Sequence, residues 1–192
     1  MIAIVDSGGA NLSSVLFAFE RLGIPAQLSS DPDTIASSAK VLLPGVGAAA
    51  AAMDTLKRNE LSACLRQLKQ PVLGICLGMQ LLYDRSEEGD ALCLGIIPGV
   101  VARLNASPGR SIPHMGWNRV TPRRDCALLD GEEFFYFVHS YAAPMGAAVC
   151  AVAEHGVEIP AVVQRENWFG AQFHPERSAA AGQRFLKRFV EL

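Results

Sequence analysis

The stretch P-V-L-G-I-C-L-G-M-Q-L-L, residues 71–82, decides both the fold and the first functional hypothesis. Its apolar first half predicts a short buried strand over Pro71–Ile75, and its second half predicts the first turns of a helix over Leu77–Leu82. Cys76 then lies on the tight turn between them, flanked by Gly74 and Gly78, as in the G-x-S-x-G nucleophile turn with sulfur in place of oxygen. We therefore expect Cys76 to be a nucleophile whose thiolate is favoured by the helix N-terminus, with a buried structural cysteine as the alternative.

Outward from this turn, strand-like and helical patterns alternate through the first half of the chain. Such alternation predicts βαβ units, and therefore an α/β fold with a mostly parallel central sheet flanked by helices. Parallel strands that are covered on both faces should be continuous apolar runs, and the runs at 3–5, 41–43 and 72–75 fit this description. The segments in chain order are Ile2–Val5, Leu12–Leu22, Ile24–Leu28, Pro32–Ser38 and Val41–Leu43.

The second half of the chain has a different pattern. A helix is predicted to begin in the alanine run Ala48–Ala52, but from about Leu94 short strand-like segments are interrupted by proline and glycine, which indicates extra antiparallel strands. The chain closes with a predicted helix over Ala179–Val190. Because neither a repeat nor a linker is visible, we expect one domain over residues 1–192.

Composition and charge exclude several classes of function. The net charge of -2 and the lack of any block of Lys or Arg argue against nucleic-acid and membrane-surface partners. The N-terminus lacks the features of a signal peptide and no apolar stretch is long enough to span a membrane, so we expect a cytoplasmic protein. Five cysteines without C-x-x-C spacing and four scattered histidines argue against a disulfide framework and against a metal site.

A cysteine nucleophile needs a base and a group that orients the base. The best candidate base is His174, at the end of an apolar strand, because Pro175 holds the residue before it in an extended conformation. Residues two apart in an extended chain face the same way, so Glu176 is predicted to lie beside the His174 ring and fix its tautomer. A surface histidine at a strand end is the alternative.

An oxyanion site is the third requirement. The segment Pro44–Gly47 (P-G-V-G) follows a buried strand and precedes a helix, so it lies at the carboxyl edge of the sheet, where α/β proteins form ligand sites. Its glycines can turn an N–H inward, and together with the N–H of Leu77 they could hold an oxyanion. The glycines could also simply make the turn.

The other three histidines (114, 139 and 155) have no carboxylate placed as Glu176 is beside His174, and they are assigned structural or contact roles. Phe134–Val138 and Trp168-Phe169 are assigned to the core.

Three of these segments together resemble the signatures of class I glutamine amidotransferases: Gly74–Gln80 (G-I-C-L-G-M-Q), Pro44–Gly47 and Phe173–Glu176 (F-H-P-E). Two more, Ile112–Asn118 and Tyr136–Tyr141, narrow the resemblance to the glutaminase subunits of imidazole glycerol phosphate synthases, from histidine biosynthesis. The resemblance spans the whole chain and implies a flavodoxin-like fold without a cofactor.

The resemblance also implies roles for individual residues. Cys76 attacks the side-chain amide of L-glutamine, while His174, oriented by Glu176, first protonates the leaving ammonia and then activates water. The substrate and oxyanion are held by Gly45, Val46, Gly47, Leu77, Gln80, Ser140 and Tyr141. The ammonia passes to a (β/α)8 cyclase subunit in a heterodimer, and the partner interface includes Asn11, Trp117, Tyr136 and Arg177.

The sequence departs from the family pattern outside the triad. The N-terminal loop carries Ser7 and Ala10 where the family has tyrosine and glycine, and Arg177 replaces the common lysine, which changes the hydrogen-bond geometry while keeping the charge. We therefore expect coupling between subunits, rather than chemistry, to be affected. Two alternatives stay open: a glutaminase subunit of another synthase, such as anthranilate synthase, and a non-catalytic interaction subunit with the same fold.

Overall fold

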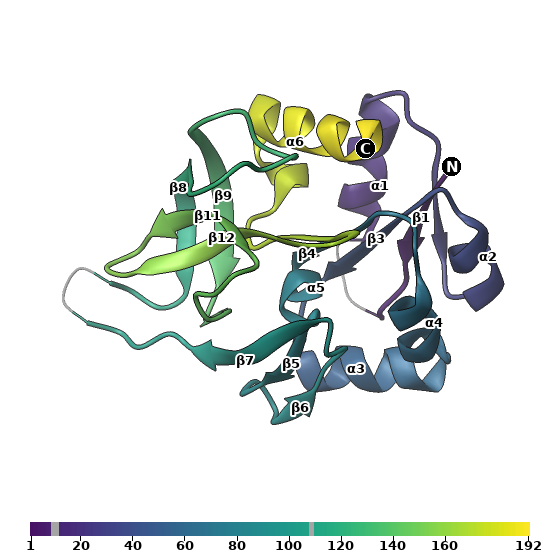
Figure 1. Ribbon diagram of the computed structural model, residues 1–192, viewed down its shortest axis with the longest axis horizontal. Helices are drawn as coiled ribbons and strands as arrows, with labels where there is room; N and C mark the ends of the chain where they lie inside the picture. Colours follow the sequence, from purple (N-terminus) through teal and green to yellow (C-terminus); the bar gives the residue numbers. More distant parts are fainter. Residues whose placement is uncertain (9–11, 108–109) are drawn as a thin grey trace.

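The computed structural model describes residues 1–8, 12–107 and 110–192. Its centre is a nine-stranded sheet whose first five strands in spatial order are parallel and whose last four are antiparallel (Figure 1). The parallel strands are β2 (Ala26–Ser29), β1 (Ile2–Val5), β3 (Lys40–Gly45), β4 (Val72–Cys76) and β13 (Trp168–Ala171). The antiparallel strands are β12 (Glu158–Arg165), β11 (Val149–Glu154), β8 (His114–Pro122) and β9 (Glu133–His139).

Side chains of the parallel strands alternate between two core layers. In β1, Ala3 and Val5 belong to one buried cluster, whereas Ile2 and Ile4 belong to the other. Period-two alternation places successive side chains on opposite faces, so a strand that is apolar throughout must be covered on both. This confirms the predicted α/β fold.

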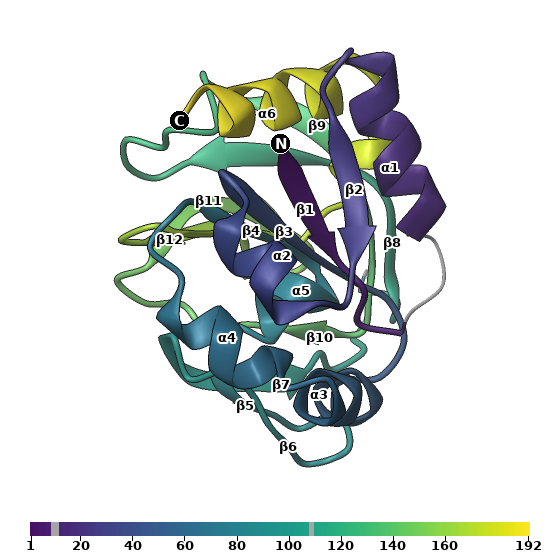
Figure 2. The same ribbon diagram turned by 90° about the vertical axis from the view of Figure 1, so that its right-hand side faces the viewer.

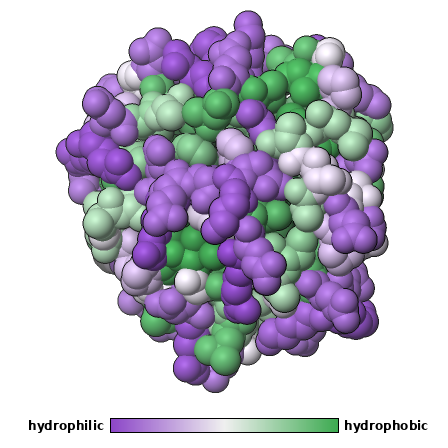
Figure 3. All heavy atoms as spheres, turned by 45° about the vertical axis from the view of Figure 1, so that its right-hand side comes forward, coloured by the Kyte–Doolittle hydropathy of each residue, from purple (hydrophilic) through white to green (hydrophobic). Residues whose placement is uncertain are grey.

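Helices cover each of these layers (Figure 2). On one face lie α1 (Leu12–Arg21) and α6 (Ala179–Glu191), and on the other lie α2 (Pro32–Ser37), α3 (Ala49–Arg58) and α4 (Leu61–Gln67). The predicted segments differ from the observed ones by at most two residues at their ends, which is within the usual spread of assigned boundaries. Seen obliquely from the side that carries α2, the surface is mostly hydrophilic with apolar patches in between (Figure 3).

A smaller sheet follows the turn at Cys76. It consists of β10 (Tyr141–Ala142), β7 (Ile97–Arg103), β5 (Tyr83–Ser86) and β6 (Ala91–Leu92). Its β10–β7 and β5–β6 pairs are antiparallel, whereas β5 and β7 are parallel. The strands predicted after about Leu94 are β7 and β10 of this sheet together with the antiparallel half of the large sheet. Within the described residues no helix is both long and apolar enough to cross a bilayer.

The helix after Cys76 is shorter than predicted. α5 covers only Leu77–Gln80, because the carbonyls of Leu81 and Leu82 bond instead to amides of the segment 94–97. Those bonds turn the chain into β5.

Candidate active site

Cys76 lies on a strained turn at the carboxyl end of β4. Its backbone angles are φ 54° and ψ -110°, outside the regions that L-residues normally occupy. The turn is possible because glycines let backbone pack on backbone: a Cβ on Gly78 would lie 1.7 Å from the Leu43 carbonyl oxygen, and one on Gly74 would lie 2.6 Å from the Gly78 carbonyl. Strain of this kind is concentrated at functional sites, where the surroundings hold it in place.

His174 and Glu176 form a buried pair. The Nδ1 atom of His174 donates to Oε1 of Glu176 over 2.7 Å, and the two side chains are only 5% and 1% exposed. His174 is extended, with φ -102° and ψ 94°, as predicted from Pro175. The prediction that Glu176 follows on an extended chain was wrong: Pro175–Arg177 is a 3-10 turn (η1), closed by a hydrogen bond from Arg177 N–H to the His174 carbonyl. This turn folds the carboxylate back beneath the ring.

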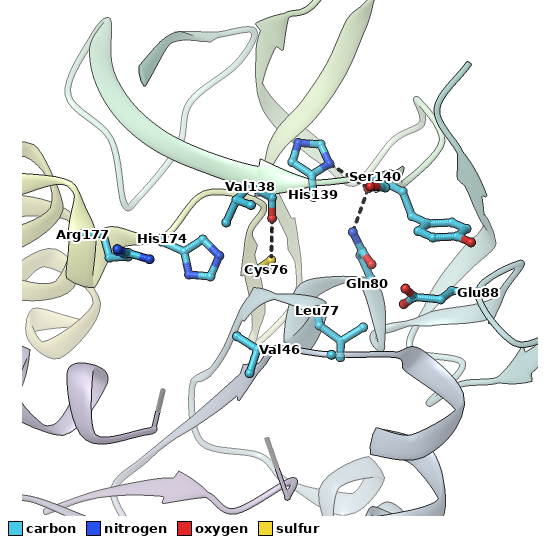
Figure 4. A pocket seen from close by; sticks show the side chains of 12 residues that line it. Val46, Cys76, Leu77, Gln80, Glu88, Val138, His139, Ser140, His174 and Arg177 are labelled. Atoms are coloured by element: carbon cyan, nitrogen blue, oxygen red, sulfur yellow. Dashed lines mark hydrogen bonds between the residues drawn. The ribbon is translucent and has the colours of Figure 1, made fainter. Parts of the chain in front are cut away.

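The second nitrogen of His174 faces the cysteine sulfur (Figure 4). Burial alone would lower the pKa of His174, but its interactions with the nearby Cys76 and Glu176 raise it to about 10. Nε2 is buried and makes no hydrogen bond to any of the described residues. An imidazolium in this position stabilises a neighbouring thiolate, the reactive form of cysteine. The three residues singled out for a triad thus lie together: Cys76 ends β4, and His174 and Glu176 lie on the segment that follows the neighbouring parallel strand β13.

A cavity of about 520 Å³ opens beside Cys76. That volume suits a small-molecule ligand. Its lining includes nearly all of the predicted substrate residues, namely Val46, Gly47, Leu77, Gln80, Ser140 and Tyr141, together with Cys76, Glu88, Val138, His139, His174 and Arg177. Gly45 is the exception. It packs beneath the turn, where an added Cβ would lie 2.8 Å from the Gly78 nitrogen.

The loop predicted to hold an oxyanion forms one edge of this cavity. Gly47 has a φ of 95° and lies in open space, so glycine is required there for its conformation rather than for packing. Leu77 is the first residue of α5, and the first amides of a helix have no partner within it. Both residues line the cavity that Cys76 faces.

Gln172 is a site residue that the sequence analysis missed. It is fully buried, and its side-chain amide lies between the pocket and the nucleophile: Oε1 accepts from Gln80 Nε2 at 3.0 Å and Nε2 donates to Cys76 Sγ at 3.9 Å. Gln80 Nε2 also donates to the Tyr141 carbonyl at 2.8 Å. The available signal was a single amide within the apolar run that leads to His174.

Three of the predicted interface residues form one patch next to this cavity. The rings of Trp117 and Tyr136 are 6.2 Å apart, and the Arg177 guanidinium lies 5.3 Å from the centre of the Tyr136 ring. Trp117 is 55% exposed, and Met115 and Phe134 nearby on β8 and β9 are 62% and 58% exposed. The core assignment of Phe134 was therefore wrong, because alternate residues of β9 face outward. The fourth interface residue, Asn11, lies outside the described residues, as does Ala10.

Among the described residues, no group of three or more His, Cys, Asp or Glu side chains could hold a metal ion. Trp168 and Phe169 are buried, as their core assignment predicted.

Comparison with known proteins gives a consistent result. Residues 3–192 match the family described as glutamine amidotransferase class-I. The imidazole glycerol phosphate synthase subunit HisH of Xanthomonas axonopodis pv. citri (strain 306) is 51% identical over 194 residues, covering 100% of this chain and 97% of the relative. The same-named subunit of Idiomarina loihiensis (strain ATCC BAA-735 / DSM 15497 / L2-TR) is 50% identical over 192 residues with the same coverage.

Solved structures agree on the fold. A crystal structure of a glutamine amidotransferase superposes with a TM-score of 0.77 at 19% identity, covering 99% of this chain and 97% of the other. A glutamine amidotransferase from Thermotoga maritima gives a TM-score of 0.66 at 18% identity, covering 99% of this chain and 80% of the other.

Proposed function

Because this chain belongs to the class I glutamine amidotransferase family, we infer that its Cys76 site hydrolyses glutamine. The chain is the glutaminase subunit of imidazole glycerol phosphate synthase, in histidine biosynthesis, since relatives with that name match it over its whole length at about half identity. No feature of the described residues favours an anthranilate synthase subunit or a non-catalytic protein. The family match over residues 3–192 also supports a single amidotransferase domain.

We propose that the reaction proceeds through a covalent thioester. The Cys76 sulfur attacks the side-chain amide carbon of glutamine, and the resulting oxyanion is held by the N–H groups of Leu77 and the Val46-Gly47 loop. His174 donates its Nε2 proton to the departing nitrogen, which leaves as ammonia. A water molecule, deprotonated by the same nitrogen, then cleaves the thioester and releases glutamate.

One observation carries this assignment. A cysteine in a strained conformation lies against an imidazole whose other nitrogen is fixed by a buried carboxylate. The Nδ1 proton is committed to Glu176, so Nε2 is the nitrogen that can exchange a proton with the sulfur or the substrate. A structural cysteine has no need of such a partner.

We further propose that the ammonia passes to a (β/α)8 cyclase subunit in a heterodimer, docked on the patch formed by Trp117, Tyr136 and Arg177. Arg177 belongs both to this patch and to the cavity lining. The backbone also links the two: the His174 N–H donates to the Tyr136 carbonyl at 2.9 Å. A partner that moves β9 therefore acts directly on the catalytic base.

The test uses the chain reconstituted with its cyclase subunit. Cys76→Ala should lower glutamine-dependent synthesis by at least about 10⁴-fold, since losing a nucleophile costs that much or more. Synthesis from ammonium should persist, which shows that the cyclase subunit in the mixture is active. A diazoketone analogue of glutamine should label Cys76 in preference to the other four cysteines. Turnover that survives in Cys76→Ala, or equal labelling of Cys126, would exclude this assignment.

A further inference from the structure

Two buried histidines outside the triad link the outer part of the sheet to the wall of the substrate cavity. On β8, Asn118 Nδ2 lies 3.0 Å from His114 Nε2, and His114 Nδ1 lies 2.9 Å from His139 Nε2. His139 Nδ1 lies 2.8 Å from the Tyr141 carbonyl oxygen. His114 and His139 are 3% and 7% exposed.

Backbone groups at both ends determine the direction of every bond in this chain. The Asn118 side-chain oxygen accepts from the Arg119 N–H at 2.8 Å, and its NH₂ group donates to the Glu154 carbonyl at 2.8 Å, so the amide orientation is fixed. The remaining amide proton is then donated to Nε2 of His114. An imidazole that accepts at Nε2 and is neutral must carry its proton on Nδ1.

The other end imposes the same arrangement. A carbonyl can only accept, so His139 must donate from Nδ1 to Tyr141 and can accept at Nε2 from His114. The two ends agree on one proton arrangement, in which both imidazoles are neutral and carry the proton on Nδ1. A proton added to either ring would place two N–H groups against each other or against the Asn118 amide.

The surroundings favour these neutral rings. Burial, with the nearby His139 and His155, lowers the pKa of His114 to about 3. Burial lowers the pKa of His139 to about 4, against the opposing effect of its bond to the Tyr141 carbonyl and with further lowering from His155 and His174. The His114 ring is stacked on Phe137 and His155, with centroids 4.6 and 4.2 Å away.

The chain of bonds ends on a functional group of the cavity. The Tyr141 carbonyl accepts from His139 Nδ1 and from Gln80 Nε2, both at 2.8 Å, which uses both of its lone pairs. Tyr141, Gln80 and His139 all line the cavity. The position of the Tyr141 carbonyl therefore determines the positions of the Gln80 amide and of residues 140–141 in the cavity wall.

We propose that His139, oriented by His114, is a positioning residue that fixes the Tyr141 carbonyl in the wall of the glutamine pocket. This inference depends on the proposed glutaminase function for one thing only, which is that the ligand of the cavity is glutamine. The hydrogen bonds of His139 go to His114 and Tyr141 rather than to Cys76, His174 or Glu176, so we expect its effect to fall on glutamine binding rather than on bond cleavage.

Two amide substitutions separate its two bonds. His139→Asn places an amide where Nδ1 lies and keeps the donor to Tyr141, whereas His139→Gln places an amide where Nε2 lies and keeps only the acceptor for His114. In the complex with the cyclase subunit, we expect His139→Gln to raise the KM for glutamine about tenfold, because the carbonyl loses a buried donor. The KM of His139→Asn should stay within about threefold of the wild-type value. In both variants kcat should change less than KM. Equal shifts in KM, or a loss confined to kcat, would refute the positioning role.

A second measurement needs no variant and no substrate. Long-range ¹H–¹⁵N correlation spectra of the wild-type chain at neutral pH should show both His114 and His139 as neutral rings protonated on Nδ1. A ring protonated on Nε2, or a charged ring, would overturn the proposal even if the glutaminase assignment holds. Conversely, if Cys76→Ala leaves glutaminase activity intact, the proposed function fails while the spectra still decide the hydrogen-bond chain.

Discussion

Gly78→Ala is the sharpest perturbation of the site, because it adds one methyl group where two backbones meet. The new Cβ would lie 1.7 Å from the Leu43 carbonyl oxygen, whereas real Cβ atoms essentially never come closer than 3.0 Å. The turn and β3 must therefore separate by at least about 1.3 Å. The obstacle is a carbonyl in a buried central strand, which cannot move aside as a flexible side chain can.

Two effects of different size follow. Overpacking in a close-packed core costs about 1 to 3 kcal/mol, and we expect at least about 3 kcal/mol here because the clash is with backbone. A displacement of about 1 Å at reacting groups can cost about 100-fold in rate, and Gly78 lies two residues after Cys76. We therefore expect Gly78→Ala to lose about 100-fold or more in kcat.

The assay combines urea unfolding of the chain with glutaminase turnover in the cyclase complex. Gly146→Ala is the matched control, because its Cβ meets nothing within 4 Å and its φ is not positive. The free energy of unfolding of Gly146→Ala should equal the wild-type value or exceed it by up to about 1 kcal/mol. If Gly78→Ala were as stable and active as the control, the close backbone packing could not be what holds the turn.

Three further outcomes are expected. Glu176→Gln should lower the pKa of His174 from about 10. The folded-state pKa of His174 is above its unfolded-state pKa of about 6.5, so the protonated ring stabilises the fold. This stabilisation is complete below about pH 6.5 and is lost as the pH rises through about 10. Urea unfolding should therefore give Glu176→Gln a lower free energy of unfolding than wild type at about pH 6, and the two free energies should converge above about pH 10. A difference that stays constant with pH would contradict the role of the His174 charge. Gln172→Leu removes the acceptor of a buried amide and should lower kcat/KM for glutamine about tenfold, and unchanged kinetics would show that this bond is dispensable. Trp117→Ala should weaken cyclase binding about 30-fold in a titration, as expected of an interface tryptophan, whereas the exposed Leu92→Ala on β6 should not; equal effects would exclude the patch as the docking surface.

Local sequence patterns were sufficient for the parts of the site that depend on short segments. The turn around Cys76 was predictable because a buried strand, two glycines and a helix start are contiguous in the chain. His174 was predictable because Pro175 restricts the residue before it. In both cases the physical cause acts within one short, contiguous segment.

Other features depend on bonds between distant segments. The length of α5 is decided by the carbonyls of Leu81 and Leu82, which bond to amides more than ten residues later. The 3-10 turn at Pro175–Arg177 is packed against β9, where the Tyr136 N–H donates to the hydroxyl of Ser178. Periodicity within one segment contains no information about such partners, so a longer helix and an extended chain were the natural predictions.

Gln172 and His139 show what the topology adds. Once β13 is paired in parallel with β4, Ala171 lies opposite Ile75, and the next residue, Gln172, is brought beside Cys76. His174 then extends two residues beyond it, over the same edge of the sheet. His139 arrives from the antiparallel half, whose strand β9 ends above that edge. The reaction centre is thus assembled where the parallel and antiparallel halves meet, and His139 comes from the half whose strand pairing no local pattern could predict.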